Sequence, residues 1–367
     1  MSPSARSRPL HPSALLTALP GMIGFIPERS LILLAFGDDP GTINTSMRHD
    51  LILDENGELV DALVSVLDGL ADVCLRNEVR SVVAVVVDDR HPISDARYRR
   101  VCEVADARFA AVGGICAGFV VGTVAENARW QRVWVTAGAA PSISPVSPSD
   151  LSSGRIGDPH TSPTAVRRTV RTGRRVLAHR EEMEEMLRPL PHCVGPHDGG
   201  GSPARLRVVD DPDDGVLLRE ILDQVLARAV PSAVPDLDCA TVTRLGEALL
   251  RLPVRDAAMS FADTDLRHAA ESLWRELARR LTGRSRASAA TMLAYQHYVD
   301  GEGGYAGVAL DCALNADPEW SLAILLDRAL RGGLPPDSMR AMIPMCRDVA
   351  TTLGVVMPDP SVEREVG

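Results

Sequence analysis

The sequence has few aromatic residues and no excess of positive charge. Phenylalanine, tryptophan and tyrosine make up only 4 % of its 367 residues, so aliphatic side chains must form most of any core. Acidic residues outnumber basic ones by 49 to 39, which gives a formal net charge of −10. Because a protein that wraps nucleic acid needs surplus Lys and Arg to neutralise phosphates, this balance argues against nucleic acid as a partner.

The cysteine pattern is not that of a metal or redox site. None of the seven cysteines forms a Cys-x-x-Cys pair, and most lie in apolar segments. We therefore interpret them as reduced core residues of a cytoplasmic protein.

Long hydrophobic runs are also missing. Residues 110–125 carry no charge, but these 16 residues are fewer than the roughly 20 that span a bilayer. Arg6 and Arg8 precede an apolar N-terminal stretch, yet Pro20 and Gly21 interrupt it and no small-residue cleavage site follows. We expect both segments to belong to a buried core, with no membrane as a partner.

What remains is an ordinary globular composition, with 45 % apolar and 24 % charged residues, in a chain long enough for two domains. Along the first part of the chain, stretches typical of strands alternate with stretches of helical period. Ser13 is the expected N-cap of a first short helix. The further elements expected are strands at residues 30–36, 43–51, 81–89, 115–124 and 129–135, and helices at residues 58–77 and 94–111.

This alternation predicts an α/β domain at residues 1–135. Short connections between strands and helices indicate a mixed, mostly parallel sheet that starts with an N-terminal hairpin and has helices on both faces. The strand at residues 81–89 begins with seven residues, SVVAVVV, of which only the first is polar. That pattern is typical of a strand covered on both sides.

The second part of the chain is predicted to be helical. Residues 136–212 form a Pro- and Ser-rich linker and a charged helical hairpin, residues 213–350 an α-helical domain, and residues 351–367 a tail. Residues 294–330 resemble one tetratricopeptide unit. Because a single unit cannot build a concave binding array, we favour a helix pair that closes the core of this domain.

Several motifs resemble a known family. In chain order they are LPGMIGFIPERSLILLAF, RHDL, GTVAENARW, TGRRVLAHREEMEEML and LAYQHYVDGEGGYAGVALDCALNADPEWSLAILLDRAL. Together they are similar to an actinobacterial family known only as a domain of unknown function, number 4192, over nearly the whole chain. Members often carry a cysteine-containing segment with Gly-Thr-Pro after the Arg-Trp pair, and this chain has neither. The resemblance therefore implies kinship but no activity and no metal.

Strand order brings polar residues to one edge of the predicted sheet. If the first two strands form a hairpin and a right-handed crossover leads to the third, the first strand begins where the second and third end. Ligands of open α/β sheets bind outside such edges. The candidate ligand-binding residues gathered there are Gly24, Arg29, Ser30, Arg48, Asp50, Asp88 and Asp89.

Each of these candidates also has a purely structural interpretation. Arg29 and Arg48 beside Asp50 could bind a carboxylate or phosphate, or could form an Arg–Asp pair that ties the hairpin to its neighbour. Gly21 and Gly24 precede a strand rather than a helix and no lysine follows, so we favour a tight turn over a phosphate loop. Asp88 and Asp89 resemble paired carboxylates, but strand neighbours point to opposite faces, which favours a helix-cap or loop role.

No other motif supports a reaction. Ser30, Asp50 and either His49 or His91 could form a hydrolase triad, but the chain has no Gly-x-Ser-x-Gly elbow. The segments HCVGPHD and DDPDDG lack the ligand spacing of zinc and calcium sites. We therefore assign no catalytic residue and no metal, and the cofactor stays unknown.

One local basic segment stands out in this acidic chain. Six arginines from Arg167 to Arg180 precede a run of glutamates. They could dock RNA or an acidic partner, but no aromatic residues are interleaved to stack on bases. Pairing with the glutamates inside a helical hairpin is the favoured interpretation.

Two functions follow as hypotheses. The preferred one is a non-catalytic binding or assembly protein that acts through protein–protein contacts or self-association. The alternative is an enzyme or sensor that binds a small anionic ligand at the predicted sheet edge, namely a nucleotide, a sugar phosphate or a carboxylate. The sequence does not decide whether the protein is an enzyme.

Overall fold

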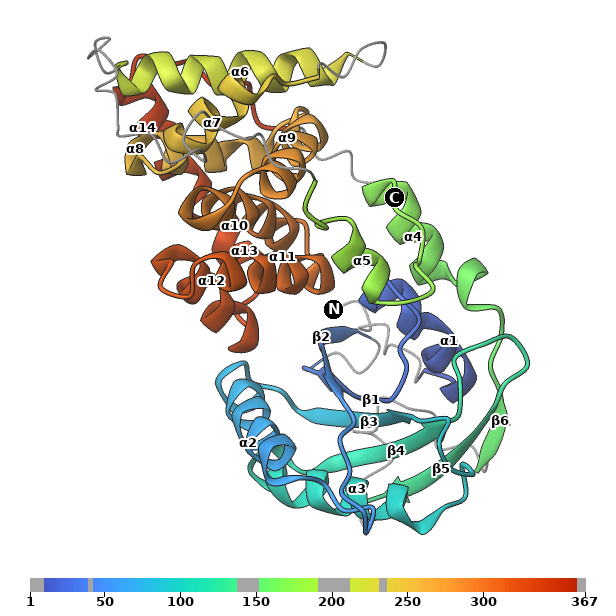
Figure 1. The fold of residues 1–367 in the computed structure, drawn as a ribbon. Coiled ribbons are helices and arrows are strands. Elements are labelled where there is room, and N and C mark those ends of the chain that lie inside the picture. Colours follow the sequence, from blue (N-terminus) through green and yellow to red (C-terminus); the bar gives the residue numbers. More distant parts are fainter. Residues whose placement is uncertain (1–9, 39–41, 137–151, 191–211, 231–235, 362–367) are drawn as a thin grey trace, which may run out of the picture. The chain divides into compact units, whose positions relative to one another are not determined.

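The computed structural model describes residues 10–38, 42–136, 152–190, 212–230 and 236–361. The chain divides into two compact units, Met1–Glu182 and Met183–Gly367, with the boundary inside the short helix α5 (Glu181–Glu185). The first unit contains a sheet with helices, and the second is built from helices (Figure 1). None of the described helices combines the length and the apolar composition that a membrane crossing requires.

The sheet of the first unit has the strand order β2-β1-β3-β4-β5-β6. Among the described strands β3 and β4 are the one parallel pair, and all other neighbours are antiparallel. The predicted α/β class and the N-terminal hairpin are confirmed, but the expectation of a mostly parallel sheet is wrong. It fails because β3 lies beside β1 rather than β2, and because β5 and β6 continue the sheet in antiparallel fashion. The strands are β1 (Ser30–Phe36), β2 (Ile43–Asp50), β3 (Ser81–Val87), β4 (Ile115–Val121), β5 (Arg129–Val135) and β6 (Ser153–Arg155).

Helices cover both faces of the sheet, as predicted (Figure 1). Helices α2 (Asp61–Arg76) and α3 (Ala96–Arg108) pack on one face, and α1 (Pro12–Ile23) packs on the other. Side chains of β1 alternate between the two cores, so that Leu33 lies under α2 and α3 and Ile32 under α1. Every residue of β1 and β3 is buried, because both strands are central and covered on both sides.

Helix α1 is capped at both ends. Its N-cap is His11 rather than Ser13, because His11 Nδ1 accepts the hydrogen bond from the backbone N–H of Ser13 at 3.2 Å. The hydroxyl of Ser13 instead accepts a hydrogen bond from Trp130 Nε1 at 3.0 Å. Gly24 ends the helix with a φ of 99°, a conformation that favours glycine, so its predicted turn role is confirmed. Gly21, for which a turn was also expected, lies inside α1 instead.

The segment after β5 contains β6 and the arginine-rich helix α4. Strand β6 pairs with β5, and Ile156 behind it is buried. Helix α4 (Pro163–Thr172) starts at its N-cap Ser162 and ends at Gly173 in the left-handed conformation. An ion pair between Arg175 and Glu182, 3.9 Å apart, is of the kind expected between the arginine and glutamate parts.

The second unit is helical, as predicted for residues beyond 213. Helix α10 (Gly283–Val299) is buried from Ala287 to Val299 and packs against α9 (Arg267–Arg280) and α11 (Gly303–Ala316). The pairing of α10 with α11 agrees with a helix pair that closes the core. The other helices are α6 (Asp214–Ala229), α7 (Cys239–Ala248), α8 (Leu252–Ala258), α12 (Ser321–Arg331), α13 (Pro336–Arg340) and α14 (Ile343–Thr352).

Most of the described cysteines are free thiols, as predicted. They are Cys74, Cys102, Cys116, Cys312 and Cys346. Cys239 is disulfide-bonded, which corrects the expectation that all seven are reduced. This residue is exposed at the first position of α7 and so differs from the core cysteines on which that expectation depended.

Candidate functional site

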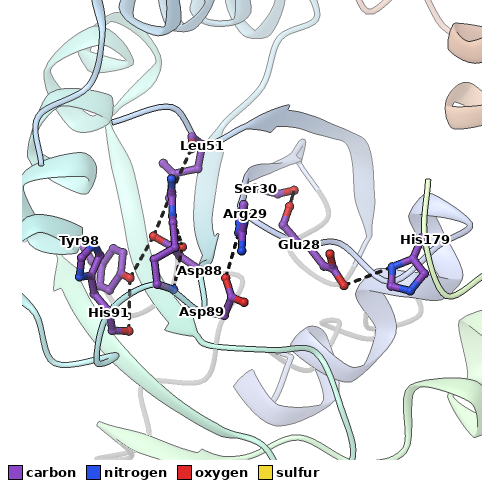
Figure 2. A network of polar contacts seen from close by, with 10 residues as sticks. Glu28, Arg29, Ser30, Leu51, Asp88, Asp89, His91, Tyr98 and His179 are labelled. Carbon is purple, nitrogen blue, oxygen red and sulfur yellow. Dashed lines mark hydrogen bonds and ion pairs between the residues drawn. The ribbon is translucent and has the colours of Figure 1, made fainter. Parts of the chain in front are cut away.

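The edge of the sheet where β1 begins holds most of the predicted site residues. Ser30, the first residue of β1, is paired in register with Asp50 at the end of β2 and with Val87 at the end of β3. Strands β2 and β3 therefore both end where β1 begins, as the topology argument predicted. Figure 2 shows the polar contacts around Asp88, Asp89 and Glu28 at this edge.

Asp88 is the centre of a buried network. Its carboxylate is fully buried and accepts hydrogen bonds from Arg90 Nε at 2.7 Å and from the hydroxyl of Tyr98 at 3.1 Å (Figure 2). Arg90 Nη2 also donates to the carbonyl of Leu51 at 3.1 Å. Burial, followed by the adjacent charge of Asp88, raises the pKa of Tyr98, which therefore stays a neutral donor. Asp88 thus joins the end of β3 to α3 and to the residue after β2.

Asp89 has a separate environment from its neighbour. Its Oδ1 lies 3.1 Å from Arg29 Nε, and both side chains are more than half exposed (Figure 2). The hydrogen bond from Arg29, together with the charge of that guanidinium, holds the pKa of Asp89 below its usual range. Asp88 and Asp89 therefore do not form a paired carboxylate site. Arg29, which has a φ of 42°, pairs with Asp89 and not with Asp50 as the sequence suggested.

Arg48 is held by three neighbours at the edge. Its Nη2 lies 2.6 Å from Asp50 Oδ1, its Nε donates to Ser30 Oγ at 2.9 Å, and its guanidinium carbon lies 5.6 Å from the centre of the Phe25 ring. Its side chain is only 20 % exposed. Burial lowers the pKa of Arg48; the charge of Asp50 opposes this and that of Arg180 adds to it.

The glycine-containing stretch before β1 contacts residues of the later segment 168–179 of the same chain. The backbone of Phe25 forms a parallel bridge with Leu177, and Glu28 Oε1 lies 3.3 Å from His179 Nδ1 (Figure 2). A Cβ atom at Gly24 would lie 2.7 Å from Nη2 of the buried Arg168. The glycine therefore admits a guanidinium of this chain, in addition to making its turn.

The arrangement does not support a hydrolase triad. The hydroxyl of Ser30 donates to the carbonyl of Glu28 at 2.6 Å and accepts from Arg48, so no histidine activates it. His49 Nδ1 lies 3.2 Å from the carbonyl of Asp50, and His91 Nε2 lies 2.7 Å from Arg97 Nη1. Neither ring contacts Ser30.

Metal sites gain no support from the described residues. Within them, no group of three His, Cys, Asp or Glu side chains is placed to hold a metal ion. The HCVGPHD segment lies outside the described residues. In the DDPDDG segment, Asp213 is the N-cap of α6, and its Oδ1 accepts the backbone N–H of Gly215 at 2.6 Å. That contact is a cap rather than an ion site.

Taken together, the arginines and aspartates of the edge form Arg–Asp pairs. Each predicted arginine and aspartate has an intramolecular partner, which is what the structural interpretation requires. Arg48 Nη1, however, donates to no residue of the described chain, and Arg180 lies close enough to lower the Arg48 pKa. Phe25 and Arg180 were not among the predicted site residues. Phe25 follows Gly24 directly, but Arg180 comes from a distant segment whose placement no local pattern reveals.

Comparison with known proteins gives a family and no activity. Neither a curated protein nor a solved structure matches the chain. The family model described as a domain of unknown function, DUF4192, matches residues 12–337, a range that includes β1, β2, the edge residues and most of the helical unit. The chain therefore belongs to the DUF4192 family.

Proposed function

We propose that this protein is a non-catalytic binding protein that docks an acidic protein partner on the exposed face of α4. The observation that carries the proposal is a pair of valines, Val166 and Val170, which are 52 % and 69 % exposed. They are one turn apart, so their side chains form a continuous apolar stripe on the helix.

The charges on α4 define the kind of partner. Arg167 and Arg171 are exposed and also one turn apart, so a row of guanidiniums borders the valine stripe. The opposite face is fixed in the first unit, because Ala165, Arg168 and Thr172 are buried. A rigid helix with an apolar stripe and a basic border complements a segment that presents apolar side chains next to Asp or Glu.

The internal pairing at the sheet edge supports a non-catalytic role. Ser30, Asp88 and Asp89 are engaged by other side chains or by the backbone, and within the described part of the chain no histidine is hydrogen-bonded to Ser30. A reaction at this edge would need at least one activated group.

A photo-crosslinking experiment tests the proposal. A photo-reactive residue is placed at position 170, and in a matched control at position 216, where Val216 on α6 is 48 % exposed. We expect a discrete crosslinked protein from position 170 and none from position 216. Equal products from both positions, or no product from position 170, would refute α4 as the docking face. A product that contains two copies of this chain would replace the acidic partner by self-association.

Affinity measurements with the purified partner then test the chemistry. Reversing the border charges in R167E/R171E should weaken binding at least about tenfold, and raising the salt concentration should weaken wild-type binding. Arg331, an exposed arginine that pairs with Asp327 within α12, supplies the control R331E. An equal loss in both variants would show an effect of net charge rather than of this face.

A second candidate function is the binding of a small anion at Arg48. The favouring observation is that this partly buried guanidinium is held by Ser30 and Asp50, close to a second arginine, with Nη1 not engaged by the described residues. Such a fixed fork suits a carboxylate or a phosphate. A thermal-shift screen with nucleotides, sugar phosphates and carboxylates should give a stabilising ligand whose effect is lost in Arg48→Lys. Silence for every compound, with both proteins folded, would reject this candidate.

A further inference from the structure

The helical unit contains an open cleft along one side of α9. Its volume is about 480 Å³, which is in the range of small-molecule sites. The α9 residues that line it follow a helical stripe, and Leu190 and Asp236 complete the wall. The α9 residues are Ser272, Arg275, Glu276, Arg279 and Arg280.

The carboxylates of the cleft are already matched by two arginines. Glu276 Oε2 lies 2.6 Å from Nη2 of Arg228, whose side chain is fully buried. Glu276 Oε1 lies 3.0 Å from Arg280 Nη1, and the same nitrogen lies 3.9 Å from Asp236. The negative charges of Glu276 and Asp236 are therefore compensated by Arg228 and Arg280.

Arg275 and Arg279 remain as a cationic pair. Arg275 has one ion pair, 3.6 Å from Glu271, and donates no hydrogen bond within the described chain. Arg279 uses its Nε to donate to the carbonyl of Arg188 at 3.0 Å, which fixes the guanidinium and leaves both terminal nitrogens available among the described residues. The two side chains are one helical turn apart and line the same cleft.

We infer that this cleft binds a small molecule through a phosphate group held between Arg275 and Arg279, with the hydroxyl of Ser272 as a further donor. Two guanidiniums can present several N–H donors to the oxygens of one phosphate, and the hydroxyl one turn before Arg275 extends the same stripe. A cationic surplus in a chain of net charge −10 fits an anionic ligand. The site is independent of α4 and of Arg48.

Isothermal titration with inorganic phosphate and pyrophosphate tests the inference on the full chain. We expect both anions to bind and pyrophosphate to bind more tightly. R275Q/R279Q should lower the affinity at least about tenfold, since both guanidinium forks are lost. The control R331Q removes the same kind of charge from exposed α12 and should change the affinity less than about twofold.

A second variant separates binding from folding. Arg279→Lys keeps the charge but not the planar fork, so it should weaken pyrophosphate binding several-fold while the unfolding midpoint stays at the wild-type value. No detectable phosphate binding, unchanged binding in R275Q/R279Q, or an equal loss in R331Q would each overturn the inference. Tighter binding of malonate than of pyrophosphate would overturn the phosphate assignment.

Discussion

Arg48 reaches toward the end of β2, to Ser30 at the start of β1. Its Nε donates a hydrogen bond to Ser30 Oγ at 2.9 Å, although the register pairs Arg48 with Ile32. Ser30 is fully buried and donates to the carbonyl of Glu28 at 2.6 Å. One hydroxyl therefore connects the turn before β1 with the guanidinium on the neighbouring strand.

Ser30→Ala should remove this connection. The substitution leaves the carbonyl of Glu28 and the Nε of Arg48 without their buried partner, so we expect a loss of about 1 kcal/mol in the free energy of unfolding. The control is Ser65→Ala on α2, where an exposed hydroxyl donates to the carbonyl of Asp61 at 3.0 Å. Urea denaturation of both variants measures the difference, and equal midpoints would contradict the role assigned to Ser30.

Asp88 and Asp89 should respond very differently to the same change. Asp88→Asn weakens the pairing with Arg90 and Tyr98 inside a buried network, for which we expect a loss of about 2–4 kcal/mol in the free energy of unfolding. Asp89→Asn affects only an exposed ion pair with Arg29, and its unfolding midpoint should stay close to that of the wild type. Equal destabilisation of the two variants would show that the contrast in burial does not matter.

Of three arginines at this edge, the sequence could place only Arg48 correctly beside its partner. Hydrophobic patterning located β1 and β3, and the predicted hairpin placed β2 beside β1. Arg48 and Asp50 are two residues apart on β2, so the period of the strand brings them to the same face. The sequence does not reveal the positive φ of Arg29, whose partner is Asp89. The approach of Arg180 depends on how a segment about 130 residues further along the chain packs, and no periodicity encodes that contact.

The neighbours of β3 could not be predicted for a related reason. An all-apolar strand indicates two covered faces, but it does not say which strands lie on its two sides. Both β1 and β2 were possible neighbours, and the choice of β1 gives an antiparallel pair. The error in the mostly parallel sheet was therefore partly one of strand order, and β6, which the sequence did not predict, adds a further antiparallel pair.

Gly21→Ala should destabilise the contact between α1 and α4. A Cβ atom at Gly21 would lie 2.4 Å from the backbone nitrogen of Ala165, a distance that forces the two helices apart. We expect a loss of about 1–3 kcal/mol, typical of overpacking. Gly69→Ala is the matched control, because it lies within α2 with no atom within 4 Å of its Cβ position, and it should stabilise the chain by about 0.5–1 kcal/mol. Thermal unfolding should therefore shift in opposite directions, and a shift of the same sign in both would contradict the close approach.

The buried thiols should make the protein less stable at alkaline pH. Burial raises the pKa of Cys102 to about 12 and that of Cys346 to about 11, so the folded state holds these protons more tightly than the unfolded state does. Their contribution is complete below the ordinary thiol pKa of about 8.5 and is lost as the pH rises through the folded values. Between about pH 8.5 and 10, before tyrosines titrate in the unfolded chain, the unfolding midpoint should fall.

A labelling experiment checks the burial on which this expectation depends. In the native protein, Cys102 and Cys346 should react with a thiol reagent at pH 8 far more slowly than the half-buried Cys312, as mass spectrometry can show. Labelling of Cys102 and Cys346 at the rate of Cys312 would mean that they are accessible as thiolates, and the expected fall in stability would then have no cause.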